Sequence, residues 1–385
     1  MKDKLSQIFS YLPGELSGTQ CRHVKNTFLA ALLLAMILCP TSAYAQISWL
    51  VQISDTHLGQ SKSYEPQDKA LWIDAVSAIV CDCNDVIRPI VVINTGDLVS
   101  IGRDENYAVY REAVSSLHAP LLNCPGNHEY EIDTTTFPRC IGPSHQQQLV
   151  GDLYFVCMNT RSFMGAGNPA TEISWLTAVL ATQAAQSARI RIVCGHYPLY
   201  TDEDRHIGGV HLRKDFQVMG SNRETFIRTL RIGQADLYLS GHVHANWDQV
   251  CLVSGTHHLV TDCTENGTYR VIVVDGTNIG TRLTTTNEWP LVVVTQPTAY
   301  VNGSSAISRG VVKVRAKVFA KNEVKNVTCI TEGDHAKSLK LGDDGMWEVE
   351  LNTTEMKPGL HKLAVEAIDA ENKNSISEIN FVVHK

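Results

Sequence analysis

The first β-rich run of the chain, Ile47–Ile53, leads directly into the segment Ser54-Asp55-Thr56-His57-Leu58. The same order of features returns four times: an apolar run that predicts a strand, a sharp turn, and a side chain that can bind a metal. Those four segments read Gly96-Asp97, Gly126-Asn127-His128-Glu129, Gly195-His196 and Gly241-His242-Val243-His244. Glycine lets the backbone turn sharply. Because ligands bind at the carboxyl ends of strands in open α/β sheets, we expect the five segments to converge on one site.

Around these segments, between residues 46 and 288, short β-rich runs alternate with amphipathic stretches. This alternation predicts a layered α/β domain with helices packed outside the sheets. Among the predicted strands are Pro89–Ile93, Leu153–Met158 and Ile190–Val193, and among the predicted helices are Asp68–Cys81, Glu105–Leu117 and Glu172–Ala185. The first of these helices is expected to bury Leu71, Ala75, Val76, Ile79 and Val80 on one face.

After Trp289-Pro290 the helical periodicity disappears and strands alternate cleanly. Val311–Phe319 predicts a strand, and in its Val312–Val318 part the charged and aliphatic side chains fall on opposite faces. Residues 289–385 therefore predict a small all-β domain, an immunoglobulin-like β-sandwich in general plan. It contains no cluster of catalytic residue types, and the sequence names no partner for it.

The side chains at the five turns are imidazoles, carboxylates and an amide, with no thiolate. This mixture suits Zn, Fe, Mn or Co. His242 and His244, placed in a turn, can each reach one of two adjacent ions, and the carboxylate of Asp97 can bridge both. Two ions roughly 3.5–4 Å apart polarise a phosphoryl group and generate hydroxide near neutral pH.

As a set and in this order, the five segments resemble the motifs of the calcineurin-like metallophosphoesterase superfamily, from about Ile47 to about Thr285. The resemblance implies a β-sandwich flanked by helices and hydrolysis of a phosphomonoester or phosphodiester by a metal-bound hydroxide. It also implies two ligand groups: Asp55, His57 and His244 for one metal, and Asn127, His196 and His242 for the other. Asp97 would bridge the metals. His128 would contact the phosphate and help to protonate the leaving oxygen.

Differences between this sequence and the motifs of two subfamilies narrow the range of subfamilies that it resembles. Protein Ser/Thr phosphatases carry an Asp-Arg-Gly extension at the second motif, whereas this chain reads Gly96-Asp97-Leu98-Val99-Ser100 without that arginine. Purple acid phosphatases place a metal-binding tyrosine at the position of Ser100. The first motif is similar to that of the cyclic-nucleotide phosphodiesterase-like branch, whose substrates vary.

The amino-terminal segment predicts export. Basic residues precede the apolar run Phe28–Cys39, and Ala43-Tyr44-Ala45 supplies the small residues that a signal peptidase needs. Residues 1–45 thus predict a cleaved signal peptide and a secreted or periplasmic protein, with no membrane-spanning segment after cleavage. Of the nine cysteines beyond this segment, Cys251 and Cys263 are expected to form a disulfide across a hairpin, and Cys157 and Cys194 to be buried free thiols.

The formal net charge of −7 gives no sign of a nucleic-acid-binding patch. We therefore expect a small-molecule phosphoester as substrate and two transition-metal ions, Fe, Mn or Zn, as cofactors. An alternative is a non-catalytic secreted binding or adhesion protein built on the same fold. The presence of all seven expected ligands together with His128 favours the enzyme.

Overall fold

The structure is a computed structural model that describes residues 47–60, 66–165, 167–199, 222–299, 307–332 and 335–384. The predicted signal peptide, residues 1–45, lies outside these residues. Gln46–Lys385 form one compact unit. Its α/β part is built on two sheets that pack face to face, and its carboxyl-terminal part is all β.

The first sheet has the strand order β11-β10-β1-β2-β3. The strands are Ile47–Ile53 (β1), Val92–Asn94 (β2), Leu121–Asn123 (β3), Thr268–Asp275 (β10) and Asn278–Thr285 (β11). β2 pairs in parallel with both β1 and β3, and β10 pairs antiparallel with β1. The carboxyl ends of β1, β2 and β3 therefore lie at the same edge of the sheet.

The second sheet has the order β4-β5-β6-β7-β9-β8. The strands are Gln146–Val150 (β4), Leu153–Cys157 (β5), Ile190–Cys194 (β6), Leu237–Ser240 (β7), Trp247–Val250 (β8) and His257–Val260 (β9). β5, β6, β7 and β9 are parallel to one another, and the two edge strands are antiparallel to their neighbours. The sheets share an apolar core in which Leu50 and Ile93 of the first pack with Phe155, Ile192 and Leu239 of the second.

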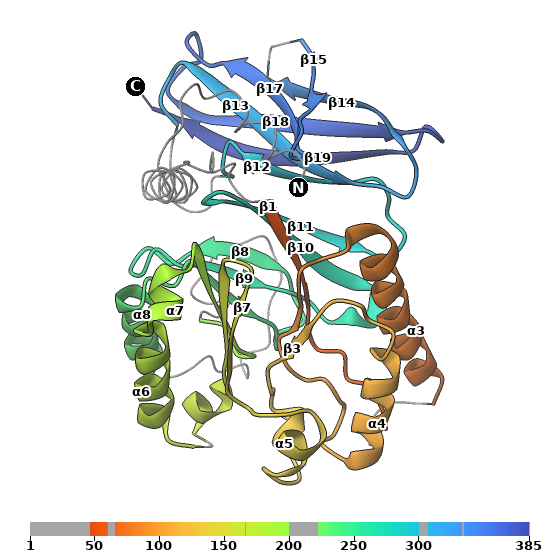
Figure 1. Ribbon diagram of the computed structural model, residues 1–385, viewed down its shortest axis with the longest axis vertical. Helices are drawn as coiled ribbons and strands as arrows, with labels where there is room; N and C mark the ends of the chain where they lie inside the picture. Colours follow the sequence, from red (N-terminus) through yellow and green to blue (C-terminus); the bar gives the residue numbers. More distant parts are fainter. Residues whose placement is uncertain are drawn as a thin grey trace, which may run out of the picture. The chain divides into compact units, whose positions relative to one another are not determined.

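Helices cover the outer faces of both sheets (Figure 1). Pro66–Asp82 (α3) and Asp104–Ala113 (α4) lie beside the first sheet, and Pro169–Leu180 (α6) and Arg223–Ile232 (α8) beside the second. Shorter elements are the π-helix Cys83–Ile87 (η2), Thr136–Cys140 (α5), Gln183–Ser187 (α7), and the 3₁₀ turns His128–Tyr130 (η3), Thr160–Met164 (η4) and Thr264–Asn266 (η7). The layered α/β fold expected from the sequence, a β-sandwich flanked by helices, is confirmed.

Two local predictions are wrong. The single helix predicted over Glu172–Ala185 is two helices, because the side chain of Thr182 accepts a hydrogen bond from Ala185 N and caps a new helix. Leu71 is 63% exposed rather than buried. Trp72 takes its place on the buried face of α3, where it packs with Val76.

The carboxyl-terminal region consists of two four-stranded sheets, β12-β13-β17-β16 and β15-β14-β18-β19. The strands are Leu291–Gln296 (β12), Val311–Phe319 (β13), Val324–Thr331 (β14), Lys337–Ser338 (β15), Lys340–Leu341 (β16), Trp347–Asn352 (β17), Gly359–Asp369 (β18) and Asn374–Val383 (β19). Val294 and Val314 of one sheet pack with Val365 and Phe381 of the other. The all-β prediction is confirmed, whereas the immunoglobulin-like plan and the boundary at residue 289 stay predictions.

Candidate metal centre

Strand ends from both sheets bring the predicted ligands together. Asp55 and His57 follow β1, Asp97 follows β2, and Asn127 follows β3. From the second sheet, His196 follows β6, and His242 and His244 follow β7. Because the five strands end at one edge of the two-sheet core, seven side chains that are up to 189 positions apart in the sequence share one site.

The backbone at this site is strained. Nine described residues other than glycine have a positive φ, and five of them are predicted ligands: Asp55 (51°), His57 (42°), Asp97 (53°), His242 (74°) and His244 (46°). Such a conformation costs about 1–3 kcal/mol each and persists only where the surroundings enforce it. Hydrogen bonds between the loops do so, with Asp55 N donating to Gly96 O at 2.9 Å and His57 N to Asp97 O at 3.0 Å.

Two motif glycines are required because neighbouring loops approach very closely. A Cβ atom at Gly126 would overlap the carboxylate of Asp97, and one at Gly241 would overlap the side chains of Ser54 and Asp55. A side chain at either position would push the loops apart and move the ligands.

The first group of possible ligand atoms belongs to Asp55, His57 and His244. Nε2 of His244 lies 3.2 Å from Nε2 of His57 and 3.4 Å from Oδ1 of Asp55. Asp55 Oδ1 and His57 Nδ1 are buried and have no hydrogen-bond partner among the described residues. Since a buried carboxylate oxygen without a hydrogen bond is costly, Asp55 Oδ1, with Nε2 of His57 and of His244 beside it, fits a cation that binds between these side chains.

The second group belongs to Asp97, His196 and His242. Nε2 of His196 lies 3.1 Å from Asp97 Oδ2, 3.1 Å from Nδ1 of His242 and 3.2 Å from Oδ1 of Asn127. Nδ1 of His196 lies 3.0 Å from the carbonyl oxygen of Thr95, which can only accept, so Nδ1 carries the proton. Nε2 is thereby directed at the centre, as is usual for metal-binding histidines.

Asp97 belongs to the second group and also faces the first. Its Oδ2 is 3.1 Å from His196 Nε2 and 3.9 Å from His57 Nε2, so one carboxylate faces both sets of ligands. A third group of possible ligand atoms combines His57, Asp97 and His128. The clustered His and Asp side chains therefore form a metal-binding site, while the role of each residue stays a prediction.

The charges at the site favour a cation. Burial raises the pKa of Asp55, but the charges of His196 and His244 outweigh burial and lower it to about 2. Burial lowers the pKa of His57 to about 4 and that of His242 to about 3. Burial also acts against the charge on His196 and His244, yet the nearby carboxylates raise their pKa values to about 9 and about 11. Metal binding at these two histidines must therefore displace protons.

His128 sits at the open side of the site, with its side chain 30% exposed. Its Nδ1 lies 2.8 Å from the carbonyl oxygen of Ser100 and donates to it, and its Nε2 lies 3.8 Å from Asp97 Oδ2. Burial lowers the pKa of His128, but Asp97 and the Ser100 carbonyl raise it above its usual value. Nε2 is therefore the ring nitrogen on the side of Asp97.

Glu129 ends the motif Gly126-Asn127-His128-Glu129, and the sequence alone predicts no role for it. Its buried carboxylate accepts hydrogen bonds from the backbone N–H groups of Asp97 (2.9 Å), Val99 (3.2 Å) and Gly126 (2.6 Å). Burial and the charge of Asp97 raise its pKa to about 7. Glu129 therefore joins the loops that carry Asp97 and Asn127. Its place in the Asn-His-Glu segment is the only sequence signal of this role.

The predicted Cys251–Cys263 disulfide is wrong, because both thiols are free. In the hairpin register Trp247 pairs with Val260 and Val250 with His257, so Cys251 and Cys263 lie at opposite ends of the hairpin. Cys263 instead hydrogen-bonds to His244. Cys157 and Cys194 are buried free thiols, as predicted.

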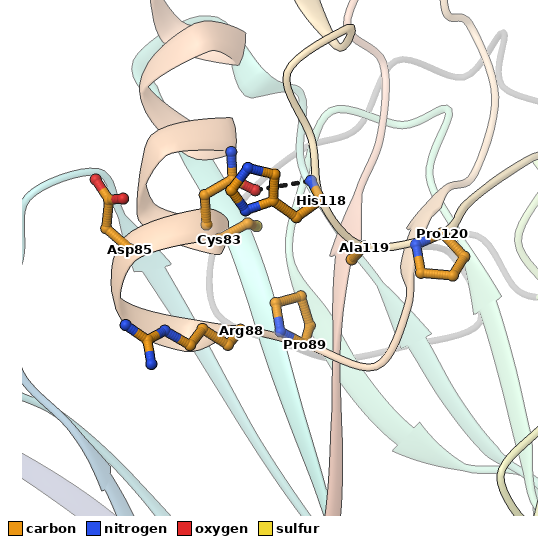
Figure 2. A pocket seen from close by; sticks show the side chains of 8 residues that line it. Cys83, Asp85, Arg88, Pro89, His118, Ala119 and Pro120 are labelled. Carbon is orange, nitrogen blue, oxygen red and sulfur yellow. Dashed lines mark hydrogen bonds between the residues drawn. The ribbon is translucent and has the colours of Figure 1, made fainter.

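A pocket of about 600 Å³ lies apart from the predicted metal ligands (Figure 2). Pro89 and Pro120, which line it, precede β2 and β3, so the pocket is at the amino ends of these strands. Beside it, the backbone N–H of His118, which is labelled in Figure 2, donates a hydrogen bond to Oδ1 of Asn84 at 2.9 Å. None of the predicted ligands lines this pocket.

Residues 48–246, more than half of the chain, match the sequence family described as calcineurin-like phosphoesterase. The chain therefore belongs to the calcineurin-like phosphoesterase family. All seven predicted ligand residues, from Asp55 to His244, lie within the matched residues.

Two curated relatives are similar over a shorter stretch. The glycerophosphodiester phosphodiesterase GpdQ of Enterobacter lignolyticus is 37% identical over 86 residues, and a probable GpdQ of Arcobacter nitrofigilis is 35% identical over 81 residues. Each match covers 21% of this chain and 29% of the relative. The chain thus spans less than a third of the length of the curated relatives it matches.

Solved structures are similar at low identity. GAP50, the anchor in the inner membrane complex of Plasmodium, has a TM-score of 0.47 and 12% identity over 63% of this chain and 86% of its own. The purple acid phosphatase PPD1 of yellow lupin has a TM-score of 0.46 and 13% identity over 63% of this chain and 52% of its own. In the part of this chain that the structure describes, no helix combines the length and apolar character needed to cross a membrane.

Proposed function

We propose that this protein is an exported phosphoesterase that binds two transition-metal ions, Fe, Mn or Zn, and hydrolyses a small phosphomonoester or phosphodiester. The observation that carries the proposal is the position of Asp97 between two ligand groups. Asp55, His57 and His244 would hold one ion, and Asn127, His196 and His242 the other. Export rests on the signal peptide that the sequence predicts for residues 1–45.

When bound, the two ions polarise the phosphoryl oxygens and lower the pKa of a coordinated water. The chain's own contribution is to orient the substrate and to move a proton. His128 donates from Nε2 to the leaving oxygen, because the Ser100 carbonyl holds Nδ1–H and leaves Nε2 on the side of Asp97, whose charge favours the protonated ring. Thr95 and Glu129 hold His196 and the Asp97 loop in place.

The names of the curated relatives support a phosphodiester as the better substrate, since both are described as glycerophosphodiester phosphodiesterases. The alternative, a non-catalytic secreted binding protein, makes no use of His128 or of the strained ligand loops. The two proposals differ in turnover and in metal content.

The test is metal analysis of the purified mature protein, with hydrolysis of bis(p-nitrophenyl) phosphate and of p-nitrophenyl phosphate before and after chelation. We expect nearly two metal equivalents, and turnover that disappears with the metals and returns when they are added back. Full activity in a verified metal-free preparation would overturn the mechanism. A metal-loaded protein that hydrolyses neither ester would favour the binding protein.

A further inference from the structure

Arg161 is held at the edge of the metal centre by the turn η4. Oγ1 of Thr160, the preceding residue, accepts hydrogen bonds from the backbone N–H groups of His196 and Tyr197, both at 3.0 Å. The guanidinium carbon of Arg161 lies 5.5 Å from the centre of the Tyr130 ring. Arg161 is therefore placed between the loop that carries His196 and the loop that carries His128 and Tyr130.

Two tyrosines, Tyr130 and Tyr197, lie near the guanidinium group of Arg161. Tyr130 is buried, and its hydroxyl is hydrogen-bonded to Ser144 at 2.6 Å, so its ring is a fixed platform for the guanidinium. The ring of Tyr197 lies 4.3 Å from that of His242. Burial raises the pKa of both phenols, and the charge of Arg161 acts in the opposite direction on each. The cation thus lies near both phenols, and Tyr197 in turn packs against His242.

No carboxylate lies within ion-pair distance of Arg161 in the ranges that the structure describes. Glu172, whose Oε1 accepts from Ser162 at 3.1 Å, is occupied on its other oxygen by His145 at 2.5 Å. Arg161 also makes no hydrogen bond or ion pair with any of the predicted ligands, all of which are described. A half-buried guanidinium with no carboxylate beside it among the described residues, next to a site proposed for anionic substrates, favours a ligand that supplies the anion.

We propose that Arg161 binds a second anionic group of the substrate. This group is a carboxylate or a phosphate on the ester substituent that stays attached to the phosphorus when the leaving group departs. The inference rests on the proposed function and narrows its substrate class. A guanidinium can donate two parallel hydrogen bonds to either oxyanion. Because Arg161 makes no hydrogen bond or ion pair with the predicted ligands, we assign it to a group other than the phosphoryl centre under attack.

Three p-nitrophenyl phosphodiesters of equal chain length test the proposal, because they share one leaving group. The second ester group is propyl, 2-carboxyethyl or 2-phosphonoethyl. We expect kcat/KM to be about 10- to 100-fold higher for at least one of the two anionic esters than for the propyl ester, as charge-assisted hydrogen bonds predict. The better of the two anionic esters identifies the source of the oxyanion.

Arg161→Met should remove this preference, mainly through KM, and Arg161→Lys should restore part of it. Arg228→Met is the matched control, since Arg228 is an exposed arginine of α8 and its loss changes the net charge equally. Metal content and the melting midpoint of each variant show whether the site is intact. If Arg161→Met does not fold, Arg161→Gln takes its place.

A second measurement does not depend on turnover. Isothermal titration of the metal-loaded protein compares 2-carboxyethylphosphonate with propylphosphonate, neither of which can be hydrolysed at its P–C bond. We expect the wild-type protein to bind the carboxylate form about tenfold more tightly and Arg161→Met to bind both equally.

The outcomes separate the two proposals. A wild-type enzyme that hydrolyses the propyl ester but shows no preference for either anionic ester overturns the role of Arg161 alone. An Arg161→Met variant that loses activity equally on all three esters shows that the arginine is structural, which also overturns the proposal. If the wild-type protein hydrolyses none of the esters, the proposed function fails and this inference fails with it.

Discussion

Two regions of the molecule bury charged side chains, and they treat them in opposite ways. At the strand ends, Asp55 Oδ1 is buried and has no hydrogen-bond partner, and five predicted ligands have a left-handed backbone. Beside the carboxyl-terminal sheets, Oδ2 of the buried Asp275 accepts from Arg315 Nε at 2.8 Å and from Thr295 and Gln296 at 3.0 Å. The first region leaves a carboxylate oxygen without a hydrogen bond beside two imidazoles, whereas the second satisfies its carboxylate within the protein.

The difference separates a site for chemistry from a site for stability. A buried carboxylate whose oxygens are all hydrogen-bonded within the protein supports the fold, whereas one with an oxygen that accepts no hydrogen bond, in a strained loop, is expected where function overrides stability. Arg315 donates hydrogen bonds to Asp344, at 2.6 Å, and to Asp275, so its charge is neutralised by carboxylates of the protein itself. Substitutions in the two regions should therefore have different consequences.

The largest effect is expected from Asp97→Asn. The substitution removes the negative charge that lies between both ligand groups, so both metal sites should weaken together. We expect a loss of metal affinity greater than the roughly 10–100-fold typical of an outer-shell partner, and turnover below detection. Metal titration and the assay with bis(p-nitrophenyl) phosphate measure the two effects.

The control for Asp97→Asn is the melting midpoint in the presence of a chelator, where it should stay close to that of the wild-type protein. An Asp97→Asn enzyme with two metals and near-native turnover would show that Asp97 does not bridge. A variant that unfolds with or without metal would instead place Asp97 among the residues that stabilise the fold, and would remove the contrast with Asp275.

The sequence alone predicts the strand-end motifs and most of the strands that carry them. β1 and β13 have the predicted bounds, because each is an apolar or alternating run ended by a clear turn. It could not predict the positive φ angles of Asp55 and His57, which depend on hydrogen bonds to the loop after β2. Strands such as β4, Gln146–Val150, were also missed, because edge strands with polar side chains give a weak periodic signal.

His128→Ala should have the second largest effect and should leave the metals in place. A general acid contributes about 10²–10⁴ in rate, and its contribution falls as the leaving group becomes more acidic. We expect a sharp loss of kcat on alkyl phosphoesters and a smaller loss on nitrophenyl esters. Equal losses on both would make His128 a phosphate-positioning residue. Loss of a metal would make it a ligand, as the group His57, Asp97 and His128 allows.

Glu129→Gln should weaken the site without removing a ligand. The carboxylate accepts three backbone N–H groups, whereas a glutamine amide turns an NH₂ donor toward at least one of them. We expect the metal affinity to fall about 10–100-fold, with kcat largely recovered at saturating metal. Competition with a metal-binding dye measures the affinity. Unchanged affinity would show that the loops around Asp97 are held by other contacts.

The carboxyl-terminal region shows a second limit of sequence reasoning. The alternation in Val312–Val318 correctly places Val314 and Ala316 in the core of the sandwich. It gives no sign that Arg315, on the opposite face of the strand, is nearly buried against Asp275 of β10. Such a pairing joins residues 40 positions apart and depends on how the sheets pack, which periodicity does not report.

Arg315→Met should have the smallest effect on catalysis and a clear effect on stability. Breaking a buried ion pair costs about 3–5 kcal/mol, and we expect about 3 kcal/mol because Thr295 and Gln296 still donate to Asp275. Thermal melting of the metal-free protein measures the loss. This substitution is a cleaner test than truncation after Glu288, since truncation would also remove Leu291 and Phe319 from a core that contains Val51.

The control is Arg282→Met, because Arg282 Nη2 donates at 3.0 Å to the carbonyl oxygen of Ile376 at an exposed position and its loss should change stability little. For both variants we expect metal content and kcat per folded molecule within about twofold of the wild-type values, since neither arginine contacts the strand-end loops. If Arg315→Met lost metal or turnover while its melting midpoint stayed unchanged, the carboxyl-terminal sheets would act on the metal centre directly. The two regions could then no longer be separated into one for chemistry and one for stability.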